Sequence, residues 1–92
     1  MATIDIVRTH SLGRAGARKA VDDMAADIAS RLQADTTWQG DTLSFKRSGA
    51  NGRIDVEEKK VRINIELGML LSPMRGMIEQ QINSYLDEHF GG

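Results

Sequence analysis

Apolar and polar residues alternate along the middle of the chain, between Thr36 and Leu67. Three residue pairs suited to tight turns interrupt this alternation: Gly40-Asp41, Gly49-Ala50 and Glu58-Lys59. Because side chains alternate between the two faces of a strand, the apolar positions all fall on one face. These positions are Leu43, Phe45, Ile54, Val56, Val61, Ile63, Ile65 and Leu67. The segment therefore predicts a four-strand antiparallel meander with one face available for burial.

The turns also predict the register of the meander. On the apolar face, the expected cross-strand pairs are Trp38 with Leu43, Phe45 with Ile54, and Val56 with Val61. On the polar face, Asp55 falls opposite Arg62. Opposite charges facing each other in this way stabilise a sheet.

Further elements flank the meander. Thr3–Thr9 reads as a strand, and apolar residues recur at helical spacing between Leu12 and about Ala34. The stripe of this first helix is Val21, Met24, Ala25, Ile28 and Leu32, and that of a second, C-terminal helix is Met74, Ile78, Ile82, Tyr85, Leu86 and Phe90. The expected caps are Ser11, Ser72 followed by Pro73, and Gly91.

The order strand, helix, four-strand antiparallel meander, helix predicts a two-layer α+β fold with both helices on one face of the sheet. Residues 1–92 form one domain on this interpretation. The element order is similar to a reduced helix-grip fold, in which a curved antiparallel sheet wraps a long C-terminal helix.

Composition narrows the classes of function. The net charge of −1 and the small number of aromatic residues argue against nucleic-acid binding. The absence of cysteine excludes disulfides and thiolate chemistry. The chain begins without a signal-peptide pattern and has no apolar run of the roughly 18 residues that a membrane span needs. We therefore expect a soluble, cytoplasmic protein with no membrane span.

The sequence shows no catalytic constellation. His10 and His89 are the two histidines and lie far apart in the chain. Metal sites need three or four ligands, and no element carries such a set at suitable spacing. The serines lack a nucleophile motif. We therefore expect no enzymatic activity, no metal and no cofactor.

Basic residues crowd the predicted entrance of the first helix. A helix N-terminus is already partly positive and favours an anion. We therefore hypothesise a polar or anionic contact made by His10, Arg14 and Arg18. The alternative is that these are solvated surface charges balanced by Asp22 and Asp23. Replacing Arg14 and Arg18 with glutamine should raise thermal stability or leave it unchanged, and a clear loss of stability would show that they are structural.

Apolar residues occupy the loop before the second helix, where polar residues are usual. They are Met69, Leu70 and Leu71, followed by Met74. Methionine adapts to irregular apolar partners as well as to core gaps. The segment is therefore either a filler of the core or, if exposed, an apolar contact site.

Several short motifs, in order and at matched spacing, resemble one protein family. They are His10-Ser11-Leu12-Gly13 with Ala17-Arg18; Phe45-Lys46-Arg47-Ser48-Gly49 with Gly52; Leu67-Gly68 with Leu70-Leu71 and Pro73; and Ile78-Glu79 with Leu86-Asp87. The resemblance, over nearly the whole chain, is to the polyhydroxyalkanoic acid system proteins. It implies an uncharacterised bacterial family associated with polyhydroxyalkanoate granules.

Two kinds of function are favoured by these observations over a third, an enzyme of hydroxyacyl chemistry, which the missing nucleophile constellation argues against. The first is a non-enzymatic accessory protein of the polyhydroxyalkanoate storage system, acting through contacts with proteins or with the polyester-granule surface. The alternative is a small carrier of an acyl, hydroxyacyl or other apolar ligand, which needs an internal pocket lined by Phe45, Ile63 and Ile82. An edge strand at Thr3–Thr9 or Thr36–Gln39 could also pair in a homodimer.

Overall fold

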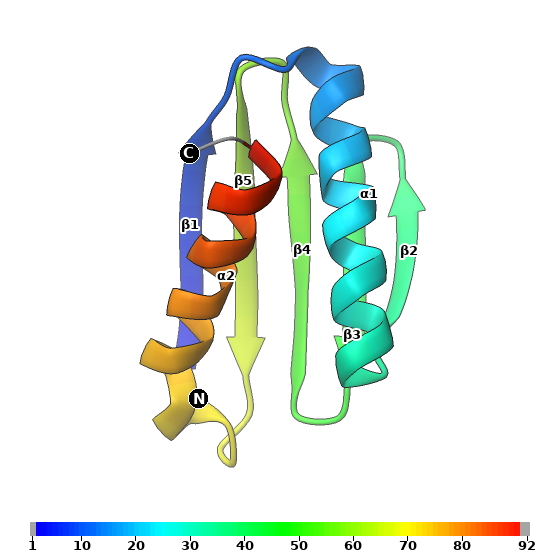
Figure 1. Cartoon of the computed structure of the whole chain (residues 1–92). Coiled ribbons are helices and arrows are strands. Elements are labelled where there is room, and N and C mark those ends of the chain that lie inside the picture. The colour runs from blue at the N-terminus through cyan, green and yellow to red at the C-terminus, as the bar shows by residue number, and fades with distance from the viewer. Residues whose placement is uncertain (1, 91–92) are drawn as a thin grey trace.

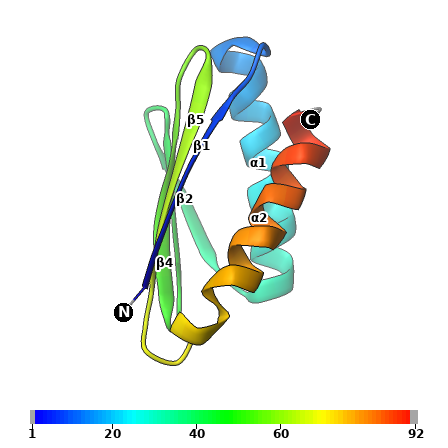
Figure 2. The same cartoon turned by 90° about the vertical axis from the view of Figure 1, so that its left-hand side faces the viewer.

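The computed structural model describes residues 2–90, apart from the side chain of Leu32. Its elements follow the predicted order: β1 (Ala2–Thr9), α1 (Gly13–Leu32), β2 (Asp35–Gln39), β3 (Thr42–Arg47), β4 (Ala50–Val56), β5 (Lys60–Leu67) and α2 (Arg75–Phe90). Both helices lie on the same face of the sheet (Figures 1 and 2). The predicted α+β class is confirmed, and the arrangement is consistent with a helix-grip-like fold.

The five strands form one antiparallel sheet in the order β1-β5-β4-β3-β2. The meander from β2 to β5 is the predicted one, and β1 joins it by pairing with β5. This pairing sets Ile4 opposite Ile65 and Ile6 opposite Ile63. It leaves β1 and β2 at the two edges of the sheet, the segments expected to be able to pair with another copy. Homodimerisation itself stays a prediction.

Two of the three predicted turns have the expected register. The observed pairs across them include Trp38 with Leu43 and Val56 with Val61. Asp55 lies opposite Arg62, as predicted. In both hairpins the turn residues identified from the sequence therefore set the pairing.

The register of the middle hairpin differs from the prediction. Phe45 lies opposite Gly52, and Ile54 lies opposite Leu43, so the predicted Phe45–Ile54 pair is wrong. The turn is centred on Ser48-Gly49, one residue earlier than expected, and Gly49 adopts the positive φ of 87° that favours glycine. The pairing shifts by two residues, so every side chain keeps its predicted face.

The core lies between the sheet and the helices. Of the eight positions predicted for the apolar face of the meander, seven are buried and Phe45 is half-buried. Ile4 from β1, Val21 and Met24 from α1, and Leu86 from α2 complete the centre of the core. The predicted stripes of both helices thus supply its other layer, apart from Met74, which is exposed and lies before α2, and with Leu32 outside the described side chains.

The predicted serine caps are wrong. Helix α1 begins at Gly13 with Leu12 as its cap residue, and no side chain caps it. The hydroxyl of Ser72 instead donates to the carbonyl of Gly68 (2.9 Å), and a short 3-10 turn over Ser72–Met74 precedes α2. The preference of serine for helix caps located the start of each helix to within a few residues. It could not predict that the Ser72 hydroxyl bonds to Gly68 instead of capping the helix. Gly91, expected to end the second helix, lies outside the described residues.

Gly52 tests the tight packing inside the sheet. A Cβ at this position would lie 2.6 Å from the carbonyl oxygen of Asn64 and 2.8 Å from Cζ of Phe45. Because one of these neighbours is backbone, we expect Gly52→Ala to lower the free energy of unfolding by about 3 kcal/mol, the upper part of the range for overpacking. Urea denaturation measures the change.

Gly76 supplies the matched control. It lies in α2, and a Cβ there would have no neighbour within 4 Å. Gly76→Ala should therefore raise stability by about 0.5 kcal/mol through helix propensity and a less flexible unfolded chain. Equal effects of the two substitutions would contradict the packing argument.

Candidate functional site

The two arginines of the predicted polar contact share one acidic partner. Nε of Arg14 lies 3.4 Å from one carboxylate oxygen of Asp41, and Nε of Arg18 lies 4.0 Å from the other. The guanidinium of Arg18 also stacks 4.3 Å from the centroid of the Trp38 ring. Trp38 is held in turn by a hydrogen bond from its indole N–H to Asp22 in α1 (3.0 Å). The arginines therefore join α1 to the β2–β3 hairpin.

His10, the third residue of the predicted polar contact, has different partners. The backbone N–H of Leu12 donates to its Nδ1 (3.1 Å), and its Nε2 donates to the carbonyl of Glu57 (3.1 Å). Since Nδ1 accepts, the proton of the neutral ring must reside on Nε2. The ring also lies 5.6 Å, centroid to centroid, from Phe90. His10 therefore ties the β1–α1 connection to the end of β4.

These contacts bear on the anion hypothesis without testing it. The positive charge at the helix entrance is balanced within the protein, and a neighbouring cation, Arg8, pairs with Asp87 of α2 (2.7 Å). The ion pairs of Arg14 and Arg18 are about half exposed, so an external anion would compete with Asp41 for them. A polar contact at His10, Arg14 and Arg18 stays a prediction.

The predicted apolar contact site divides into two parts. Met69 and Leu70 project from the loop before α2, with 82% and 91% of their surface exposed. Leu71 is half-buried and packs against the core, while Met74 is 41% exposed. We call the exposed pair Met69 and Leu70 the apolar tip.

Backbone hydrogen bonds hold the apolar tip in place. The N–H of Gly68 donates to the carbonyl of Gly49 (2.8 Å), which links the loop to the β3–β4 turn. The N–H groups of Leu71 and Ser72 both donate back to the carbonyl of Gly68 (3.1 and 3.0 Å). The two apolar side chains are thus presented by a hydrogen-bonded turn.

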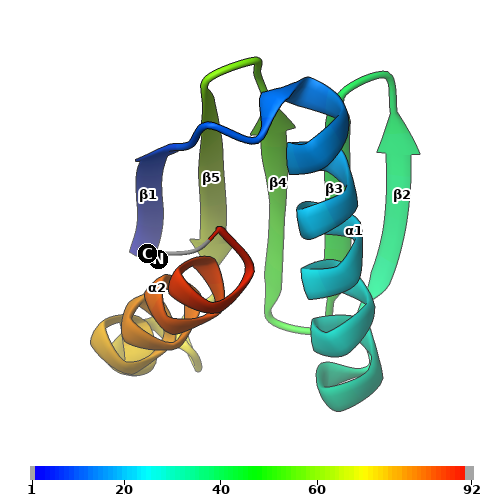
Figure 3. The same cartoon turned by 45° about the horizontal axis from the view of Figure 1, so that its top comes forward.

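An apolar cleft lies between the two helices and the sheet. In Figures 1 and 3, α2 approaches α1 at its C-terminal end and diverges from it toward its beginning. The cleft opens in this divergent region and has a volume of about 320 Å³. Its apolar walls include Ile28 of α1, Phe45 and Ile65 of the sheet, and Leu71, Met74, Met77 and Ile82 beside or within α2.

The cleft matches the pocket expected for a carrier in part. Phe45 and Ile82 line it as predicted. Ile63 does not: it is 1% exposed and belongs to the closed part of the core, whereas its neighbour on the same face, Ile65, reaches the cleft. Sequence periodicity identifies the shared face of these two isoleucines but not where along it the helices separate.

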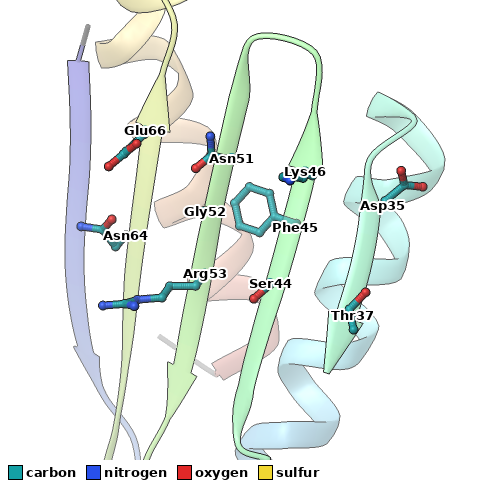
Figure 4. Close-up of a pocket in the computed structure, with 10 residues that line it drawn as sticks. All are labelled: Asp35, Thr37, Ser44, Phe45, Lys46, Asn51, Gly52, Arg53, Asn64 and Glu66. Carbon is teal, nitrogen blue, oxygen red and sulfur yellow. The ribbon is translucent and has the colours of Figure 1, made fainter. Parts of the chain in front are cut away.

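A second hollow lies on the face of the sheet that no helix covers. Figure 4 shows its polar side chains spread across several strands rather than converging on one point. Its lining carries both signs of charge, including Lys46, Arg53, Asp35 and Glu66. This mixed polar surface was expected from the alternating pattern and suits solvent.

Within residues 2–90, no three histidine, aspartate or glutamate side chains gather closely enough to hold a metal ion. Over the same residues, neither helix has the combination of length and apolar character required to cross a bilayer.

The fold defines a small α+β protein with an apolar tip, an apolar cleft and an internally paired basic entrance. The chain belongs to the family described as "putative polyhydroxyalkanoic acid system protein", whose model matches residues 4–90. The resemblance inferred from the sequence motifs is thereby confirmed. Searches of curated proteins and of solved structures gave no match.

Sequence reasoning missed part of the cleft. The C-terminal end of α1 contributes Ile28 and Arg31, the connection from α1 to β2 contributes Ala34, and the end of β3 contributes Arg47. Only the splay of the two helices brings these residues together, and a single sequence carries no signal for that angle. The sequence carries one indirect signal for the cleft. The predicted apolar face of the sheet is wide, and the apolar stripes of two short helices are too small to cover all of it.

The two arginines at the helix entrance should differ in their effect on stability. Arg18→Gln loses both a partly exposed ion pair and the contact with Trp38, so we expect a loss of about 1 kcal/mol in the free energy of unfolding. Arg14→Gln loses only an exposed ion pair and should change stability by less than about 0.5 kcal/mol.

Thermal and urea denaturation of both variants measure this difference. The structure thus revises the expectation that losing both charges costs nothing. A stable Arg18→Gln variant would show that the stacking on Trp38 contributes no net free energy.

Proposed function

We propose that this protein is a non-enzymatic accessory protein of the bacterial polyhydroxyalkanoate storage system. It acts in the cytoplasm, at the storage granule, through contacts with the granule surface or its coat proteins. Membership of the polyhydroxyalkanoic acid system family supports the association with the polymer system. The mode of action is inferred from the surface of the chain.

The exposed apolar tip carries this proposal. Leu70 is 91% exposed and Met69 82%, in a loop that its own backbone hydrogen bonds hold in place. Burying a side chain of this size against an apolar surface is worth roughly 1.5–3 kcal/mol. Because the turn is already ordered, contact with a polyester surface loses little loop entropy. Two such side chains suit reversible attachment better than bulk coating of a granule.

The basic entrance supplies a second, polar contact in this proposal. Arg14 and Arg18 remain about half exposed while paired with Asp41, and an acidic coat protein would replace that carboxylate. His10 lies at the same entrance, where its two ring nitrogens bond to the backbone, so in this proposal an external partner would replace one of these bonds. Contacts of this kind weaken with salt because exposed charges are screened.

The absence of catalysis is likewise part of the proposal. Both ring nitrogens of His10 are occupied by hydrogen bonds to the backbone, which supports a structural or contact role for it. The apolar tip carries no nucleophile or acid–base group. The residues on which the proposal rests are suited to contact.

Co-sedimentation with polyester granules tests the apolar contact. The double variant Met69→Ser/Leu70→Ser should bind protein-stripped polymer at least tenfold more weakly than the parent, because it removes most of the apolar area of the tip. The parent's binding to stripped polymer should survive high salt.

Val7→Thr is the matched control for this experiment. Val7 is another exposed apolar residue, 52% exposed and on β1, away from the tip. The Val7→Thr variant should bind stripped polymer like the parent. Thermal denaturation should show that the parent, the double variant and Val7→Thr are all folded. Equal losses in both variants, or no binding by the parent, would overturn the apolar-tip contact.

Native, protein-coated granules test the polar contact. Arg14→Gln/Arg18→Gln should reduce binding to coated granules at low salt and leave binding to stripped polymer unchanged. Arg53→Gln, an exposed arginine on the uncovered face, is the control. Salt-insensitive binding of the parent to coated granules, unaffected by the double variant, would remove His10, Arg14 and Arg18 from the proposal.

A further inference from the structure

The cleft between the helices has the shape and lining of a small ligand site. Its volume of about 320 Å³ falls at the lower end of the roughly 300–1,000 Å³ typical of small-molecule pockets. It holds roughly ten groups the size of a water molecule, at about 30 Å³ each. A methylene group is of similar size, so a single alkyl chain of eight to ten carbons fills it.

The walls of the cleft favour an alkyl chain over a polar ligand. On the side of α2, the long and flexible side chains of Met74 and Met77 are 41% and 56% exposed, which places them at the mouth. Phe45 and Ile65 form the sheet side. Thioether side chains adapt to irregular apolar groups, so the mouth can close around a chain of varying length.

The charges around the cleft are all of one sign. Arg31 and Arg47 are part of its lining, and no aspartate or glutamate is. Arg31 pairs with Asp27 on its own helix (Nε to Oδ1, 3.3 Å), outside the cleft. Within residues 2–90, Arg47 forms no ion pair, and its Nε donates to the neighbouring carbonyl of Ser48 (3.3 Å). An unpaired guanidinium at the rim of an apolar cleft favours an anionic head group.

We propose that the cleft binds a medium-chain monocarboxylate. The alkyl chain lies between α1 and α2 against Phe45 and Ile65, and the carboxylate meets the guanidinium of Arg47. This binding site goes beyond the granule contacts proposed above and does not depend on them, because Met69 and Leu70 do not line it. Leu71 and Met74, which the sequence grouped with the tip, line the cleft and have no part in the granule contact proposed above.

Methionine-methyl NMR of the whole protein tests the site directly, with octanoate as the probe. Met74 and Met77 line the cleft, Met24 lies in the closed core at 1% exposure, and Met69 belongs to the exposed tip. Octanoate should shift the methyl signals of Met74 and Met77 in a saturable way and leave those of Met24 and Met69 in place. The uncharged 1-octanol should bind more weakly at the same signals.

Arg47→Gln tests the head-group contact. Losing a charge-assisted hydrogen bond should weaken octanoate binding about tenfold and leave 1-octanol binding unchanged. Arg53→Gln, on the uncovered face and paired with Asp55, is the matched control and should bind both probes like the parent. Since Arg47 is exposed, neither variant should fail to fold.

Ala50→Leu tests the cleft itself from the sheet side. Ala50 lines the cleft, and a larger side chain there should occupy its volume and abolish the shifts of Met74 and Met77 for both probes. Overturning results would be saturable shifts confined to Met69, equal binding of octanoate by the parent and Arg47→Gln, or no shift at all. If the protein failed to bind granules but octanoate still shifted the signals of Met74 and Met77, the granule contact would be overturned and the cleft site would stand.

Discussion

The pairing of β1 with β5 is the interaction on which the rest of the structure depends. It joins residues 2–9 to residues 60–67 and adds the last strand to an otherwise local meander. The sheet gains Ile4, fully buried, and with it an apolar surface on which α2 can pack. Without β1, α2 would cover the edge of a four-strand sheet. Because these contacts close a long loop, we expect them to form late in folding.

Packing on the widened sheet separates the two helices. The core is continuous where α2 approaches α1, with Val21 and Leu86 both fully buried. Toward the end of α1 the same sheet face is covered by half-buried side chains, such as Ile28 and Ile78. The cleft is thus a region that two short helices leave open on a five-strand face. Its apolar character follows from the core pattern that produced the fold.

Sequence reasoning succeeded where the spacing of apolar residues or the position of a turn determines the structure. The two-residue period assigned the faces of β3, β4 and β5 correctly, even in the hairpin whose turn was placed one residue late. It could not predict partner choice among polar groups. Asp41, expected as a turn residue, pairs with both Arg14 and Arg18, and Ser72 bonds to Gly68 rather than capping a helix. Such choices depend on distances of an ångström or less, which composition and spacing do not encode.

The bond from Gly68 to Gly49 has a mechanical consequence. It fastens the loop before α2 to the β3–β4 turn, and Leu71 packs so closely there that a Cβ on Gly49 would lie 3.3 Å from its Cδ1. Any force on Met69 and Leu70 therefore reaches Leu71, a wall of the cleft, through one or two peptide units. If attachment of the tip to a surface moved Leu71, attachment and occupancy of the cleft would be linked equilibria. Linkage then requires that each change the affinity of the other by the same factor.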